Sequence, residues 1–325
     1  MVLSGLEFFT SRIQPINMNI TSRKNLSQYG LDPTAGMPSI KYMFGLSDTT
    51  GMNSVESVGT NRGSLRNSNN ISLSSGIKII KQMDMTLKYD RDQNRSETTT
   101  ITGDRSESWF YSEKDNGFPI PEWSFRWTGL EQIKFIKNFV QRVSFDHNFS
   151  GRKQESWQNV DTNITRESYT KQFRPLAGLN ISFKNKINMN IRYNWSEDIN
   201  FTRSGGSGGQ KNVSSDLSLT ANYSHSGGFR LPIPFLKNKE LKNNVDVQVT
   251  FSMNKNTGYQ QLRGQPWTET KNTESWNFEP KMTYSFSRNV RGGMNFKIGK
   301  NKNKTIGATS IKEFGIHVSI IISGR

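Results

Sequence analysis

Cysteine is absent from the chain, and other residues and motifs that would indicate chemistry are scarce. Without cysteine the chain can form neither a disulfide nor a thiolate metal site. There are three histidines, and His147 and His317 have no second ligand at the spacing of a metal site. The sequence has no Gly-x-Ser-x-Gly nucleophile elbow and no Gly-x-x-x-x-Gly-Lys-Ser/Thr phosphate loop. We therefore expect neither an enzyme nor a bound cofactor.

Long hydrophobic runs are also missing. No window approaches the roughly 18 consecutive apolar residues of a membrane helix, and the mean hydropathy is −0.70. The residues after Met1 have neither the basic start nor the apolar core of a signal peptide. If the protein is exported, we expect that Met1 is not the start of the native polypeptide.

The net charge of +16 is compatible with several acidic partners. Nucleic acid, anionic lipid and lipopolysaccharide would all suit it, and so would a basic surface that serves only solubility. A nucleic-acid platform needs aromatic and basic side chains on one surface. Here the aromatic residues alternate with most of the lysines along the strand-like runs, so no nucleic-acid partner is expected.

Alternation of apolar and polar residues is what the chain has in abundance. In the stretch 117–150, Trp123, Phe125 and Trp127 alternate with polar residues, and a second run from Val143 to Phe149 does the same. Side chains in a strand point to opposite faces with period two, so each run has one apolar and one polar face. The two runs flank the connector 129–141, which predicts an antiparallel hairpin.

About thirteen strands of this kind are expected, most of them about 9–11 residues long, the span of a tilted transmembrane strand. They lie at 16–20, 40–46, 71–79, 83–89, 123–127, 143–149, 179–183, 187–195, 217–223, 245–253, 276–286, 294–298 and 314–322. Short or medium connectors near 80–82, 129–141, 184–186, 225–244 and 287–289 alternate with long polar ones. The long ones, expected to be outward loops, lie near 91–121, 151–176, 196–213, 254–274 and 299–312.

This layout predicts an all-β fold, an antiparallel up-and-down transmembrane β-barrel formed by residues 1–325 as a single segment. The residues expected to face lipid or to form an aromatic girdle are Trp123, Phe125, Trp127, Phe145, Phe183, Met189, Tyr193, Trp195, Tyr223, Phe251, Trp276 and Tyr284. Those expected to face a hydrated lumen are Arg126, Asn180, Ser182, Lys184, Asn190 and Arg192.

The expected strand number is odd, whereas closed bacterial single-chain barrels have an even number. An open sheet would expose its edges where no water can satisfy them. Either a further strand completes a barrel of about fourteen, or the chain is a partial barrel from a larger one. A soluble β fold would also show alternation, but the interfacial aromatic residues and the uncharged apolar faces favour the barrel.

Several segments resemble the C-terminal region of the SprA/Sov family. They are Ser39–Leu46, Phe118–Trp123, Thr128–Leu130, Phe145–Phe149, Phe173–Lys184 and Leu231–Phe235. That family comprises outer-membrane translocons of the type IX secretion system, which are also linked to gliding motility. The resemblance runs along the chain, is clearest at 117–253, and implies the last third or so of a very large protein-conducting barrel.

The resemblance implies localisation in the outer membrane, where lipid and lipopolysaccharide, secreted cargo, and plug or accessory subunits would be partners. It supplies no catalytic residue. Two other functions stay open: a general porin or solute-uptake barrel, and a soluble basic β protein that binds polyanions.

Overall fold

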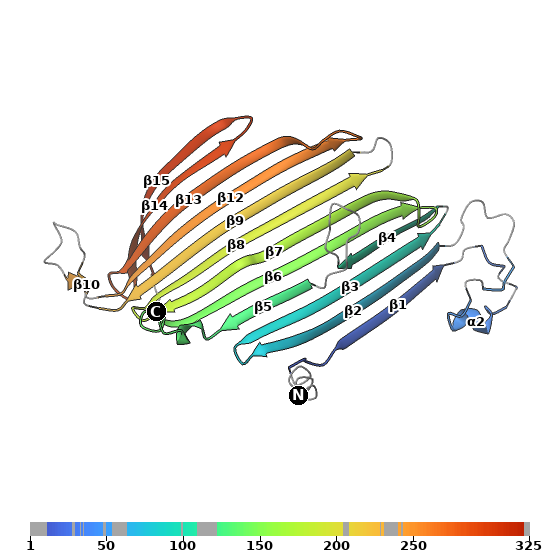
Figure 1. Cartoon of the computed structure of the whole chain (residues 1–325), viewed down its shortest axis with the longest axis horizontal. Coiled ribbons are helices and arrows are strands. Elements are labelled where there is room, and N and C mark those ends of the chain that lie inside the picture. The colour runs from blue at the N-terminus through green and yellow to red at the C-terminus, as the bar shows by residue number, and fades with distance from the viewer. Residues whose placement is uncertain are drawn as a thin grey trace, which may run out of the picture.

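The computed structural model shows one large antiparallel sheet (Figure 1). It describes residues 12–27, 30–32, 34, 36–47, 50–53, 64–98, 100–108, 122–203, 208–227, 229–230, 240–241 and 243–321. The segments 118–121 and 231–235, which carry part of the family resemblance, lie outside these residues. No helix in the described part is long and apolar enough to cross a membrane.

Among the described residues, thirteen strands form the sheet, and two residue pairs form a separate small ladder. The sheet strands are β1 (Asn17–Ser27), β2 (Ser64–Ile80), β3 (Met83–Glu97), β4 (Ile101–Ser108), β5 (Glu122–Thr128), β6 (Val140–Gln158), β7 (Ile164–Phe183), β8 (Ile187–Thr202), β9 (Gly208–His225), β12 (Val245–Leu262), β13 (Thr268–Ser285), β14 (Val290–Asn303) and β15 (Gly307–Ile320). The small ladder joins β10 (Phe229–Arg230) to β11 (Glu240–Leu241), and the helical turns are α2 (Ile40–Met43) and the 3-10 turn η1 (Leu130–Gln132).

Neighbours in the sequence are neighbours in the sheet, so the topology is up-and-down throughout. Two strands, β4 and β5, share one position in the sheet. The first half of β3 pairs with β5, and its second half pairs with β4. Both also pair with β6, so β4 and β5 lie end to end between β3 and β6. The predicted all-β, antiparallel, up-and-down fold is therefore confirmed, and the described residues form an open wall of thirteen strands, as expected for a partial barrel.

The predicted strand at 40–46 is wrong. This segment contains the helical turn α2, in which the Ser39 hydroxyl caps the N-terminus by accepting from the Tyr42 amide at 3.4 Å. Gly45, with φ of +70°, then turns the chain away. The number of strands in the sheet still equals the expected thirteen, because β4, which was not predicted, offsets the missing strand at 40–46.

The long loops predicted near 91–121, 151–176, 196–213, 254–274 and 299–312 are largely strand where the structure describes them, and 109–121 lies outside the described residues. Strands β6 to β9 and β12 to β15 have 14–20 residues, well beyond the predicted length. The described turns at this end are short, at 159–163, 263–267 and 304–306. Backbone ladder bonds do not depend on apolar side chains, so the pairing continues into polar sequence.

In the described part of the chain the sheet is a single layer. Its strands pack against their ladder neighbours, and no second large sheet or long helix lies over them. Within the described ranges, a packed cluster lies at the short-turn end, where Leu130, Val140 and Val143 meet. The first and last strands, β1 and β15, each have one ladder partner, so both edges of the described sheet are open.

Candidate functional site

The first feature of the wall is a belt of apolar side chains, which runs across the strands on one face of the sheet. Residues directly opposite in an antiparallel ladder share a face, and Ile191 lies opposite Leu179 on β7 and Leu219 on β9. Phe251 continues the row between Leu219 and Phe278. The stretch of β8 from Ile187 to Trp195 matches the roughly 9–11 residues that a tilted strand needs to cross a bilayer.

An aromatic row marks one border of this belt on β5 to β8. The rings of Trp123 and Phe149 stack with their centroids 4.2 Å apart. Phe149 and Phe173 follow at 5.0 Å, and Phe173 and Trp195 at 5.9 Å. Phe149 is 2% exposed although the sheet has one layer, because the rings on adjacent strands cover each other. Tryptophan near the end of an apolar stretch is typical of a membrane interface.

The structure places the predicted lipid-facing residues on this one face. Trp127 lies opposite Phe145, Met189 opposite Ala221, and Trp276 opposite Met253. Other members of the set are Phe125, Phe183, Tyr193, Trp195, Tyr223, Phe251 and Tyr284.

The opposite face carries amides, hydroxyls and carboxylates that bond across strands. Asp146 lies 3.5 Å from the Arg126 Nε and accepts from the Asn180 Nδ2 at 3.1 Å. Asn190 in turn donates to the Asn180 side chain. Asp216 accepts from a neighbouring asparagine in the same way, at 2.7 Å. A carboxylate held by donors from the next strand keeps this face hydrophilic and ordered.

The predicted lumen-facing residues lie on this polar face, with one at its edge. Ser182 lies opposite Asn188, and Arg192 opposite Ser218. Lys184 lies in the turn after β7, where its backbone amide donates to the Phe139 carbonyl at 3.1 Å.

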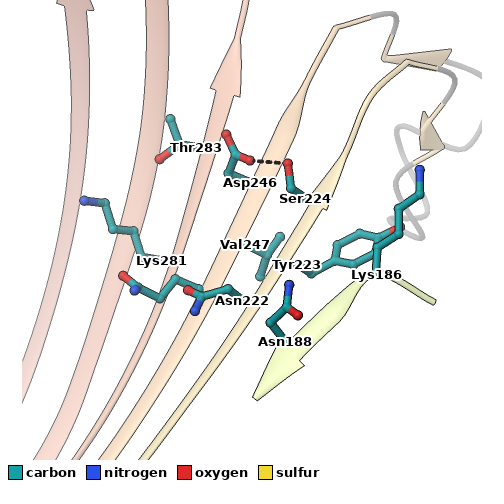
Figure 2. Close-up of a pocket in the computed structure, with 10 residues that line it drawn as sticks. Lys186, Asn188, Asn222, Tyr223, Ser224, Asp246, Val247, Lys281 and Thr283 are labelled. Atoms are coloured by element: carbon teal, nitrogen blue, oxygen red, sulfur yellow. Dashed lines mark hydrogen bonds between the residues drawn. The ribbon is translucent and has the colours of Figure 1, made fainter. Parts of the chain in front are cut away.

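A hollow of ≈ 330 Å³ opens in the wall near the short-turn end (Figure 2). Strands β8, β9, β12 and β13 line it, and the Ser224 hydroxyl donates to the Asp246 carboxylate at 2.6 Å. Lys186 and Lys281 also line the hollow, so both charge signs are present. Among the described residues no group of histidines and carboxylates could hold a metal ion. The hollow is part of the polar wall.

Beyond the aromatic row, the face that carries the belt becomes charged. Glu155 on β6 is 4% exposed and accepts from the Arg105 Nε at 3.1 Å, with the Lys153 Nζ at 2.7 Å. Glu167 on β7 is 6% exposed and accepts from the Arg203 Nε at 3.2 Å. Lys153 lies 4.0 Å from Glu167 and so links the two carboxylates. Burial raises the pKa of Glu155, but the hydrogen bonds from Lys153 and Arg105 outweigh it and leave the pKa below its ordinary value.

The charged ladder continues on β8 and β9. Glu197 lies 3.8 Å from both Lys171 and Lys211. The Lys171 ammonium is 5.5 Å from the Trp195 ring centroid, and that of Lys211 is 5.2 Å from Tyr259. Such cation–π contacts lie within the distance at which the ring attracts a cation. We call these pairs, from Arg105 on β4 to Lys211 on β9, the charged ladder.

Sequence reasoning missed the charged ladder because it treated 151–176 and 196–213 as loops. A signal was present: Lys153, Glu155, Glu167 and Lys171 keep the period-two phase of the aromatic residues before and after them. Opposite charges facing each other across strands stabilise a ladder.

No family model and no curated protein matches the chain. Among solved structures it is similar to the ferric yersiniabactin uptake receptor FyuA from Yersinia pestis, at 12% identity and a TM-score of 0.25. That match covers 96% of this chain and 55% of the receptor, so this chain spans about half the receptor's length. OmpT, an outer membrane protein of Vibrio cholerae, matches at 8% identity and a TM-score of 0.15, covering 95% of this chain and 96% of OmpT. The fold assignment rests on the strand ladder itself.

Proposed function

We propose that this chain forms part of the wall of an outer-membrane β-barrel, with the belt in lipid and the polar face lining a hydrated channel. The belt carries the proposal. From Ile187 to Trp195 it is uncharged on its own face and is bordered by aromatic rings. In the described part no second sheet or long helix covers it, and the connector after β5 covers only its short-turn border. Exposed apolar patches of this extent on a protein indicate a membrane or a partner.

Within this proposal the channel conducts proteins, as a segment of a type IX secretion translocon. Two features favour a translocon segment over a porin. The open edges at β1 and β15 need further strands, because unpaired backbone groups in hydrocarbon cost several kcal/mol each. The resemblance to the SprA/Sov family offers a larger barrel that would supply them, with secreted cargo and plug or accessory subunits as partners.

The charged ladder suits the layer outside the hydrocarbon. At about 3.3 Å per residue, the strand extension from Glu197 to Thr202 reaches well beyond the belt. A saccharide and phosphate layer such as lipopolysaccharide accommodates charged side chains that acyl chains would not.

A soluble basic protein that binds polyanions is the second candidate. It is favoured only by the net charge of +16. Such a protein would have to cover the belt with a partner, and the arginine and lysine residues of the charged ladder already have carboxylate neighbours.

Membrane fractionation of cells that produce the native protein tests the barrel. We expect recovery with the outer membrane, resistant to extraction by high salt and alkali. Recovery in the soluble fraction would refute both barrel readings. Solute-exclusion measurements on the unplugged channel then separate a translocon, which passes protein-sized probes, from a porin, which passes only small solutes.

A further inference from the structure

The connector between β5 and β6 is a structured segment of the described chain. It begins at Gly129, whose φ of 78° is left-handed, and continues through η1 and further turns to Phe139. The Glu131 carboxylate accepts from the Val143 amide at 2.9 Å. The Lys184 amide donates to the Phe139 carbonyl at 3.1 Å, so both β6 and β7 hold the connector in place.

The connector lies against the belt face of the sheet. Leu130 is 9% exposed and packs with Val140 and Val143, and Ile136 is packed against the same cluster. Trp127, a belt residue, also borders this cluster. The connector therefore lies on the side of the wall that the proposed function assigns to lipid, at the short-turn border of the belt.

Its other apolar residues point away from this cluster. Phe135 is 79% exposed, Phe139 is 70% exposed and Ile133 is 44% exposed. Lys134 and Lys137 are exposed beside them. Hydrogen bonds hold the segment in this form, as the Phe139 amide donates to the Ile136 carbonyl at 3.0 Å. The fold thus presents large apolar side chains that its own core does not use.

We propose that this segment, residues 129–139, is an interfacial anchor that inserts Ile133, Phe135 and Phe139 into the headgroup–acyl boundary of the leaflet at the short-turn end. Its partner is anionic phospholipid. Two observations select lipid over a protein subunit: the anchor is continuous with the belt, and lysines alternate with the apolar residues. Lysines in an interfacial segment extend their ammonium groups to lipid phosphates while their stems stay in the apolar zone. The inference rests on the proposed function, because it takes the belt face as the lipid side.

Lipid quenching of a fluorophore at position 135 tests the anchor. The chain has no cysteine, so Phe135→Cys gives one label site within it, and the exposure of Phe135 means that packing is preserved. Met189→Cys provides a belt label and Asn190→Cys a polar-face label. With quenchers fixed at shallow or deep positions in phospholipid vesicles, we expect position 135 to respond to the shallow quencher. Position 189 should respond to lipid quenchers and position 190 to neither.

The outcomes separate the two proposals. If position 189 responds to lipid quenchers but position 135 responds only to a water-soluble quencher, the anchor is refuted and the barrel stands. If position 135 is shielded from both kinds of quencher, a protein covers the segment and the anchor is again refuted. If position 189 does not respond to lipid quenchers, the barrel itself fails.

The lysines are tested separately with Lys134→Gln and Lys137→Gln in the Phe135→Cys background. A lysine near an anionic membrane surface contributes an amount that corresponds to about a fivefold change in a partition ratio. We expect the ratio of inserted to water-exposed label to fall about fivefold for each lysine in anionic vesicles, and to stay unchanged in neutral ones. An equal response in both lipids would refute the anionic partner.

Discussion

Replacing Ile191 with arginine should destabilise the wall in the membrane. Ile191 lies near the middle of the belt stretch of β8, with Leu179 and Leu219 on either side. An arginine on the lipid face of a barrel costs about 2–4 kcal/mol at the bilayer midplane. The matched control is Asn190→Arg, one residue away on the polar face beside Asn180 and Thr220.

The control substitution also lowers the stability of the folded chain. Asn190 donates a hydrogen bond to Asn180, and loss of that bond costs about 1 kcal/mol. The polar face already holds Arg192, so the charge itself adds little there. The two variants should therefore differ by about 1–3 kcal/mol, which is about a 5- to 150-fold difference in folding equilibrium.

Equilibrium urea unfolding of the protein in phospholipid vesicles measures this difference. Ile191→Arg should unfold at a clearly lower urea concentration than Asn190→Arg, and less of it should reach the outer membrane in cells. Equal losses from the two variants, or a larger loss from Asn190→Arg, would refute the assignment of lipid and water to the two faces.

Three other predictions concern the aromatic row and the charged ladder. Phe149→Leu keeps the apolar contact but removes ring stacking on Trp123, and should lower stability in thermal melts by about 0.5–1.5 kcal/mol; an unchanged melt would show that the stacking contributes nothing. Glu155→Gln leaves Arg105 and Lys153 without their shared carboxylate, and should make the outer half of β6 more accessible to protease while the belt half stays protected. The depressed pKa of Glu155 means that its stabilising contribution is complete above the ordinary value of 4.5 and is lost as pH falls through the lower folded value; acid unfolding should show this loss in the native chain and not in Glu155→Gln.

The sequence predicts the belt well because the signal there is local. From Ile187 to Trp195 every second residue is apolar, and this alone identifies the strand and its two faces. The segment from Ile40 to Leu46 alternates in the same way but contains a helical turn. Alternation does not reveal whether a partner strand is available. In the described part of the chain this segment pairs with no strand, and the Ser39 hydroxyl caps its helical turn.

The charged ladder could not be predicted in the same way, because the residues that stabilise it come from different strands. Glu155 on β6 read alone is a charged residue in polar sequence. Its place in a paired strand is evident only from its partner Arg105 on β4, and β4 was not predicted from the sequence. Side-chain pairs across strands depend on register, and register is fixed only when the whole sheet forms.

If the proposed function holds, the change from Trp195 to Glu197 locates the membrane border more firmly than the belt or the charged ladder does alone. Moving the border outward would place Glu197 and Lys171 in acyl chains, where each charge costs kilocalories and an ion pair at 3.8 Å does not repay its desolvation. Moving it inward would leave Ile191 and its neighbours in water, at about 1.5–3 kcal/mol for each side chain. Both costs are smallest when the hydrocarbon ends at the aromatic row, where Trp195 presents a ring to the belt and to Lys171 together. One continuous strand can thus cross two layers of different chemistry, since its ladder bonds are the same in both.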